Sequence, residues 1–160
     1  MRALLIILIT GVLWIPSYSQ MVLSGTATGA CDCYTLTDNT NQAGSIWSPT
    51  TIDLSNPFDF TFNVNLGVDD VWGADGMIFA LRQTGTTTGA IGNGMGYSGI
   101  TPSVGLEIDT WNSSPAVASD IVSDHVAMHS NGAVNHDLVA PIAIPNIEDG
   151  AYHTCRIVWD

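Results

Sequence analysis

Basic side chains are almost absent from this sequence. Its 160 residues include three lysines and arginines in total, against fifteen aspartates and glutamates, which gives a formal net charge of −12 at pH 7. Proteins that bind nucleic acids or anionic lipids neutralise the phosphates with lysine and arginine. The composition therefore argues against both of these partners and favours neutral sugars and hard cations.

Long apolar runs are missing after the N-terminus. There, Arg2 precedes an apolar stretch at 3–15, and small residues stand just before Gln20. This is the pattern of a secretory signal peptide. We therefore expect residues 1–19 to be removed and residues 20–160 to form a domain that is secreted or held at the cell surface, without membrane insertion. The alternative is an uncleaved anchor, but a spanning helix needs about 20 apolar residues.

Cysteine is scarce, with three residues in the chain. Cys31 and Cys33 are too close together in an extended segment to form an unstrained disulfide with each other. In an oxidising compartment, one of them is expected to pair with Cys155, which leaves the other free or paired outside this chain. The spacing does not fit a cysteine-rich metal site.

No segment after Gln20 shows a persuasive helical period, whereas strand patterns are frequent. Residues 58–66 (FDFTFNVNL) alternate apolar and polar side chains, as in a strand with one buried face, and the apolar run at 77–81 fits a central strand. Turn-forming residues separate these segments, and the Gly- and Thr-rich stretch at 85–99 is expected to be one long loop. The pattern predicts an all-β sandwich or jelly roll, with further strands at 104–111, 126–128 and 152–159.

Sandwiches of this kind often run to about 200–250 residues as one domain. The sequence stops at Asp160, inside or just after a predicted strand. We therefore expect a C-terminally truncated domain, whose parent chain carries further strands and further domains.

The strand at 104–111 (VGLEIDTW) carries the first candidate ligands. Alternation places Glu107, Asp109 and Trp111 on one face, with Leu106 and Ile108 on the other. The two carboxylates are then roughly 6.5–7 Å apart, by the rise of a strand. That separation brings them near enough to share a cluster of cations.

A second strand, in 124–129 (DHVAMH), can present His125 beside these carboxylates, and Asp120 precedes His125 by five residues. Carboxylates with one imidazole suit a manganese- or zinc-like ion, and carboxylates with amide and backbone oxygens suit calcium. The alternative is a solvated polar face, which is common on half-exposed sheets. The remaining polar candidates are expected to be surface or strand histidines (His129, His136 and His153) and an ordinary turn (Asp69 and Asp70).

Two motifs, in this order, resemble the legume (L-type) lectin family in its secreted bacterial form. They are 73–81 (GADGMIFAL) and 104–111 followed by Asp120 and His125, with the glycine loop 92–97 (GNGMGY) between them. Segments near both ends, 34–37 with 43–47 and 149–160, are similar as well. Each motif alone is weak, but their order and spacing are fairly specific. The resemblance implies a concanavalin A-like jelly roll that binds glycans or polysaccharides through metal ions.

The resemblance also implies roles for individual residues. In the sugar site, the carboxylate of Asp75 would accept hydrogen bonds from hydroxyl groups, and Gly94 would donate its backbone N–H. The peptide bond between Ala74 and Asp75 would be cis. Trp111 could stack on a pyranose ring, with a buried core position as its alternative. The manganese-like ion would be held by Glu107, Asp109, Asp120 and His125, and the calcium by Asp109, Asp120, the Trp111 carbonyl and an Asn in the following loop.

The calcium loop departs from the family pattern. The family Asn stands where this chain has Ser113, and Asn112 comes one residue early. The loop to Asp120 is also two residues longer than in concanavalin A-like sequences. Asn112 is therefore expected as a substitute ligand or sugar contact beside Ser113, and Asp124, next to His125, as a competing ligand.

Two other functions share this fold. A β-glucanase-like glycoside hydrolase would need a second glutamate in a Glu-x-Asp-x-x-Glu strand motif, and this chain has Asn112 at that position. A structural or adhesion module would use its cations only to stiffen loops. We therefore expect a non-catalytic lectin.

Overall fold

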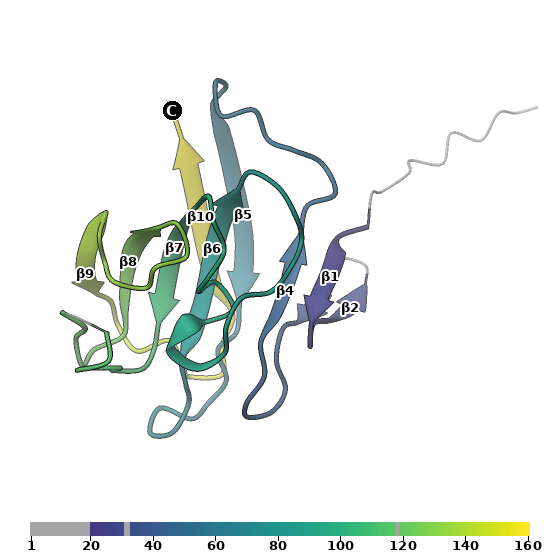
Figure 1. Ribbon diagram of the computed structural model, residues 1–160. Coiled ribbons are helices and arrows are strands. Elements are labelled where there is room, and N and C mark those ends of the chain that lie inside the picture. The colour runs from purple at the N-terminus through teal and green to yellow at the C-terminus, as the bar shows by residue number, and fades with distance from the viewer. Residues whose placement is uncertain (1–19, 31–32, 118) are drawn as a thin grey trace, which may run out of the picture.

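The computed structural model describes residues 20–30, 33–117 and 119–160, which fold almost entirely into β-strands (Figure 1). The predicted signal peptide, 1–19, lies outside the described residues. None of the helices in the described part of the chain is long and apolar enough to cross a membrane. The chain is all-β, as the sequence predicts. Its elements are β1 (Val22–Gly25), β2 (Thr28–Ala30), β3 (Cys33–Thr35), β4 (Gly44–Trp47), β5 (Phe58–Val64), β6 (Gly76–Arg82), the 3-10 helix η1 (Gly92–Gly94), β7 (Ser103–Asp109), β8 (His125–Ser130), β9 (Val139–Ala143) and β10 (His153–Trp159).

The largest sheet is antiparallel, with strand order β6-β7-β8-β9. Three further pairs are also antiparallel: β1 with β4, β2 with β3, and β5 with β10. The β5–β10 pair joins strands from distant parts of the chain and lies near β6 in Figure 1. The five predicted strand regions correspond to β5, β6, β7, β8 and β10.

Strand β9 escaped prediction because it contains Pro141, which cannot donate a ladder hydrogen bond. Proline is tolerated on edge strands, and β9 is the outer strand of the four-stranded sheet among the described residues. Tertiary pairing with β8 overrides the local signal.

The predicted disulfide was wrong, because Cys33 and Cys155 are both free thiols. Cys33 lies on β3, which pairs with β2, whereas Cys155 lies on β10 opposite Phe62 of β5. The two strands thus belong to different sheets. Cys31 lies outside the described residues.

Aromatic side chains join the β5–β10 pair to the four-stranded sheet. The ring of Phe79 on β6 lies 5.9 Å from that of Phe60 and 6.0 Å from that of Phe62, centroid to centroid. Such pairs add stabilisation beyond the area they bury. This cluster packs on the sheet face opposite the one that carries the candidate ligands.

Replacing Phe79 with alanine is therefore expected to lower the free energy of unfolding by about 2–4 kcal/mol, because it removes both ring contacts and leaves a cavity. Urea unfolding followed by tryptophan fluorescence measures the change. Val122→Ala is the control, since Val122 is 86% exposed. A Phe79→Ala protein as stable as this control would show that the ring contacts do not join the two sheets.

Candidate metal centre and sugar-binding loop

Strands β7 and β8 bring the predicted carboxylates and imidazole to one face of the sheet. Their register pairs Asp109 with His125, and Glu107 with Ala127. Glu107, Asp109 and His125 are 0%, 3% and 0% exposed. The alternation found in the sequence therefore places these side chains together, in a buried position rather than on a solvated surface.

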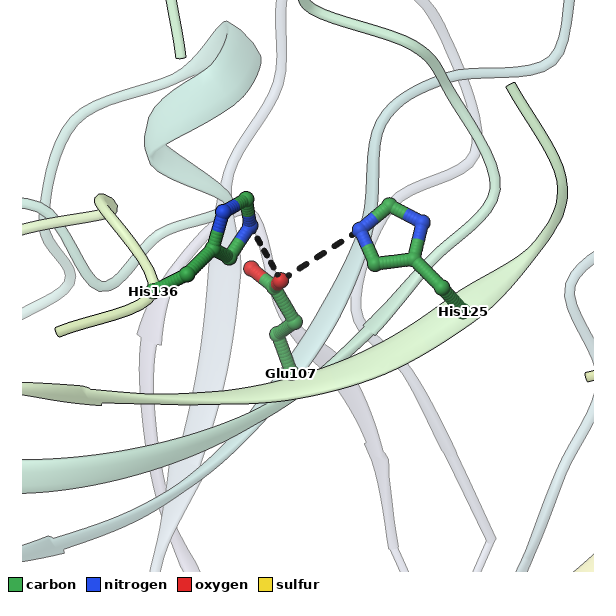
Figure 2. A group of neighbouring side chains, drawn as sticks. All are labelled: Glu107, His125 and His136. Carbon is green, nitrogen blue, oxygen red and sulfur yellow. Dashed lines mark ion pairs between the residues drawn. The ribbon is translucent and has the colours of Figure 1, made fainter. Parts of the chain in front are cut away.

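Glu107 lies among three imidazoles. Its Oε1 is 3.4 Å from His125 Nε2 and 2.9 Å from His136 Nε2, and its Oε2 contacts His129 Nε2. Figure 2 shows His125 and His136 approaching the carboxylate from two sides. His129 is a strand histidine of β8, as predicted, although it is buried against Glu107. The prediction was wrong for His136, which lies outside the strands and is buried beside the same carboxylate. His153 follows the prediction more closely, pairing with Asp149 near the surface.

Hydrogen bonds assign different tasks to the imidazoles. The backbone N–H groups of Asn135 and His136 donate to His129 Nδ1, at 3.1 and 3.0 Å. Nδ1 of His129 is therefore an acceptor, and its Nε2 carries the proton that it donates to Glu107. In His125, Nδ1 donates instead to the Ser123 carbonyl at 3.0 Å. This leaves His125 Nε2 facing the carboxylates of Glu107 and Asp120.

Asp120 reaches the same centre from the loop between β7 and β8. Its Oδ1 lies 3.2 Å from His125 Nε2, and its side chain is buried. One ligand atom each from Asp109, Asp120 and His125 falls within 4.8 Å of the others, and so does one each from Glu107, His125 and His136. Asp124 does not join them, because its carboxylate accepts the Ile147 N–H.

The titrating groups of the centre are strongly perturbed. Burial raises the pKa of Asp109 above its ordinary 3.8, more than the Trp111 N–H and the charge of His125 lower it. Burial also raises the pKa of Glu107, but the close approach of His125 and the hydrogen bond from His129 outweigh it and bring that pKa to about 2. For His125, burial lowers the pKa, and the contacts with Glu107 and the Ser123 carbonyl more than reverse the effect.

The two aspartates hold the loop that follows β7. Asp109 Oδ1 accepts the Trp111 N–H at 2.7 Å, and Asp120 Oδ2 accepts the Ser113 N–H. Asn112 turns its amide oxygen onto the backbone N–H two residues later, at 2.8 Å. The loop residues expected around calcium are therefore beside both aspartates, although the Asn112 oxygen serves its own turn. The Trp111 side chain is partly exposed.

The backbone of Asp75 is attached to the strand that carries the ligands. The peptide bond between Ala74 and Asp75 is cis, as the resemblance implies. The Asp75 carbonyl accepts the Thr110 N–H at 3.0 Å, one residue beyond Asp109. The next residue, Gly76, has φ 143°, and a Cβ there would lie 2.3 Å from the Ile108 carbonyl oxygen, so a larger residue does not fit. Burial raises the pKa of the Asp75 carboxyl.

The glycine loop lies over the same sheet (Figure 1). Tyr97 is buried against Gly105 of β7, where a Cβ would come within 2.9 Å of its ring. Gly94 is buried at the end of η1, and its N–H donates to the Ile91 carbonyl at 3.4 Å. The long bond is weak, so the Gly94 N–H is only loosely engaged.

The sequence matches the profile of the L-type lectin domain family, described as the legume lectin beta-barrel domain, over residues 16–160. The chain belongs to the L-type lectin family. This assignment and the antiparallel strands of the structure together confirm the predicted jelly-roll sandwich. L-type lectin domains generally bind carbohydrate, often with metal ions, and are generally not enzymes.

The residues of this L-type lectin fit a bound cation. Glu107 Oε1 and His125 Nε2 are buried and make no hydrogen bond of acceptable geometry among the described residues. These two atoms face the same centre as Asp109 and Asp120. In the described part of the chain, no lysine or arginine forms an ion pair with any residue of this centre. Oxygen and imidazole donors together suit a first-row transition ion.

Sequence reasoning missed His129 and His136 as contributors to this lectin centre. Alternation on β8 already placed His129 on the face of His125. The Asn131–Gly132 pair, a turn signal, could have indicated the reversal that returns His136 to the sheet.

Without metal ions, the lectin is expected to lose stability as the pH rises from about 4 to 9. The raised pKa of Asp109 means that the folded state binds this proton more tightly, which stabilises it below pH 3.8 and ceases to do so as the pH rises through the raised value. The raised pKa of His125 acts in the same direction above pH 6.5. A tenfold tighter hold on one proton in the folded state contributes about 1.4 kcal/mol to the free energy of unfolding. Glu107 acts oppositely, but only below pH 4.5.

Urea midpoints in chelator across this range measure the effect. Asp109→Asn should reduce the loss of stability with rising pH at the acidic end of the range, whereas Asp38→Asn, at an exposed position, should not. The same slope in both variants would mean that Asp109 is not the group responsible.

Proposed function

We propose that this chain is an exported lectin domain that binds a glycan reversibly at the loop carrying Asp75, and that divalent cations held by neighbouring residues are required for binding. The observation that carries the proposal is the joining of Asp75 to the buried centre through the Thr110 N–H. A cation that rigidifies this centre would therefore also restrain the backbone of the loop that carries Asp75. The signal-peptide pattern supports export to the cell surface or beyond, and further domains of a parent chain remain part of the proposal.

Asp75 has the chemistry that a sugar site needs. A carboxylate accepts hydrogen bonds from two hydroxyl groups without offering a competing proton. Its partial burial strengthens such bonds by excluding water. Gly94 would supply a backbone donor, Trp111 an aromatic face and Asn112 an amide near the same loops.

Glu107, Asp109, Asp120 and His125 would hold a manganese-like ion. Calcium would be held by Asp109 and Asp120, with the Trp111 carbonyl and the Asn112 or Ser113 side chain. Bound cations would neutralise the buried carboxylates, which otherwise repel one another. Asp109 and Asp120 already fix the backbone of this loop by accepting N–H groups, so they connect ion binding to loop shape.

Hydrolysis is disfavoured by the surroundings of Glu107. A glycosidase presents its two carboxyl groups to the substrate on either side of the scissile bond. Glu107 has no exposed surface and is enclosed by imidazoles, and Asn112 stands where the second glutamate would be. A purely structural module would share the cations but not the affinity for sugar, and a glycan array separates it from a lectin.

The sugar site is tested with Asp75→Ala. A hydrogen bond to a charged group contributes about 1.5–3 kcal/mol, so the affinity for an array-selected glycan should fall about 10- to 100-fold. Chelation should weaken wild-type binding as well, and added manganese with calcium should restore it. Asp38→Ala is the control. Binding that survives both chelation and Asp75→Ala would rule out the proposed site.

The metal ligands are tested by comparing Asp120→Asn with His136→Gln. Calorimetric titration of manganese into chelator-stripped protein should show at least a tenfold loss of affinity for Asp120→Asn and a smaller loss for His136→Gln. The order follows because Asp120 shares a ligand group with a second carboxylate, Asp109, and with His125, whereas the group that contains His136 has the single carboxylate of Glu107. A greater loss for His136→Gln would place the ion among the imidazoles instead.

A further inference from the structure

A second acidic group lies outside the centre described above. It combines Asp70 from the segment between β5 and β6, Asp124 just before β8, and Glu148 from the segment between β9 and β10. One carboxylate oxygen from each falls within 4.8 Å of the others. Asp124 and His125 are neighbours in an extended segment, so their side chains leave the backbone in opposite directions.

Glu148 is the member that points to a ligand. It is 4% exposed, and its Oε2 is buried with no hydrogen-bond partner among the residues that the structure describes. Burial raises the pKa of Glu148, and the charges of Asp124 and Asp70 raise it further, against a Thr110 side-chain hydrogen bond that lowers it. A buried carboxylate oxygen without a partner is costly unless a proton or a cation neutralises the group.

Among the described residues, no lysine or arginine side chain neutralises the Glu148 carboxylate. Arg156 pairs with Asp59, and the Arg82 guanidinium bonds Thr87. The polar neighbours orient the carboxylates instead: Asn146 donates its amide to Asp70, and Ile147 donates its N–H to Asp124 at 2.8 Å.

We propose that Asp70, Asp124 and Glu148 bind a calcium ion, separate from the ions of the Glu107 centre. All three donors are oxygens, which suits a hard cation, whereas the Glu107 centre includes imidazole nitrogen. Ligands about 2.4 Å from a shared calcium lie at most about 4.8 Å apart, which matches the spacing of the group. Glu148 also lines a cavity of about 320 Å³, which leaves room for water ligands on the Glu148 side of the group.

The site would fix the segment that leads into Asp75. Asp70 belongs to that segment, and the adjacent Asp69 carbonyl accepts the Gly73 N–H at 2.8 Å. A Cβ on Gly73 would lie 2.2 Å from Glu148 Oε1, so the segment packs directly on the acidic group. The proposal does not depend on sugar binding by Asp75.

Terbium luminescence tests the site in the whole protein, because Trp72 lies two residues from Asp70 and can sensitise a bound lanthanide. Calcium should compete for the terbium. Asp70→Asn, at an exposed position, should weaken calcium at least tenfold. Glu148→Gln should abolish this component and raise the melting temperature in chelator, since it removes a buried charge. Trp72→Phe should remove the signal while leaving the calcium-induced stabilisation intact.

Asp38→Asn is the control of equal charge change and should behave as wild type. Asp120→Asn and Asp75→Ala should retain the Trp72-dependent signal even where they lose sugar, which separates this site from the lectin function. Loss of the calcium component in either Asp70→Asn or Glu148→Gln supports the site. Should both variants keep the wild-type calcium affinity and stabilisation, the proposal is overturned.

Discussion

The structure depends on the burial of several carboxylates on one sheet face in a chain that offers almost no basic side chains to neutralise them. Glu107 and Asp109 are nearly inaccessible to solvent, and Asp120 is brought to them by a loop. Imidazoles and backbone N–H groups supply the polar partners instead. A hydrophobic pair at these positions would pack at lower cost. The energetic penalty therefore indicates a function for the charges, and the proposed cation binding matches the donors.

The Asp75 loop is attached on two sides. On one side, the Asp75 carbonyl bonds to the Thr110 N–H, immediately beyond the strand that carries Glu107 and Asp109. On the other, Gly73 packs against Glu148 of the second acidic group. Two separate centres of negative charge thus border the same short segment. Neutralising either would stiffen the loop from a different direction, which preorganises a binding site without adding any contact to the ligand.

Sequence reasoning succeeded where a regular period determined the outcome. Alternation along β7 and β8 was enough to place Glu107, Asp109 and His125 on one face. His136 and Glu148 come from irregular segments, whose positions depend on turns and long-range packing that no local pattern specifies. The disulfide failed for a related reason, because the strand pairing of Cys33 and Cys155 separates them. Export, ion identity and the sugar contacts stay predictions, since neither the fold nor the family assignment specifies them.

The histidines around Glu107 bear on which ion the centre prefers. His129 is committed as a donor to Glu107 Oε2, because its other nitrogen accepts two backbone N–H groups. That hydrogen bond orients the carboxylate and leaves Oε1 directed toward His125 and His136. An ion displaced toward His136 would gain a second nitrogen donor and become a better site for zinc, while an ion nearer Asp109 and Asp120 would favour manganese. The position of a bound ion along this short line of ligands would therefore determine its identity, and it is the aspartate end that is joined to the Asp75 loop through Thr110.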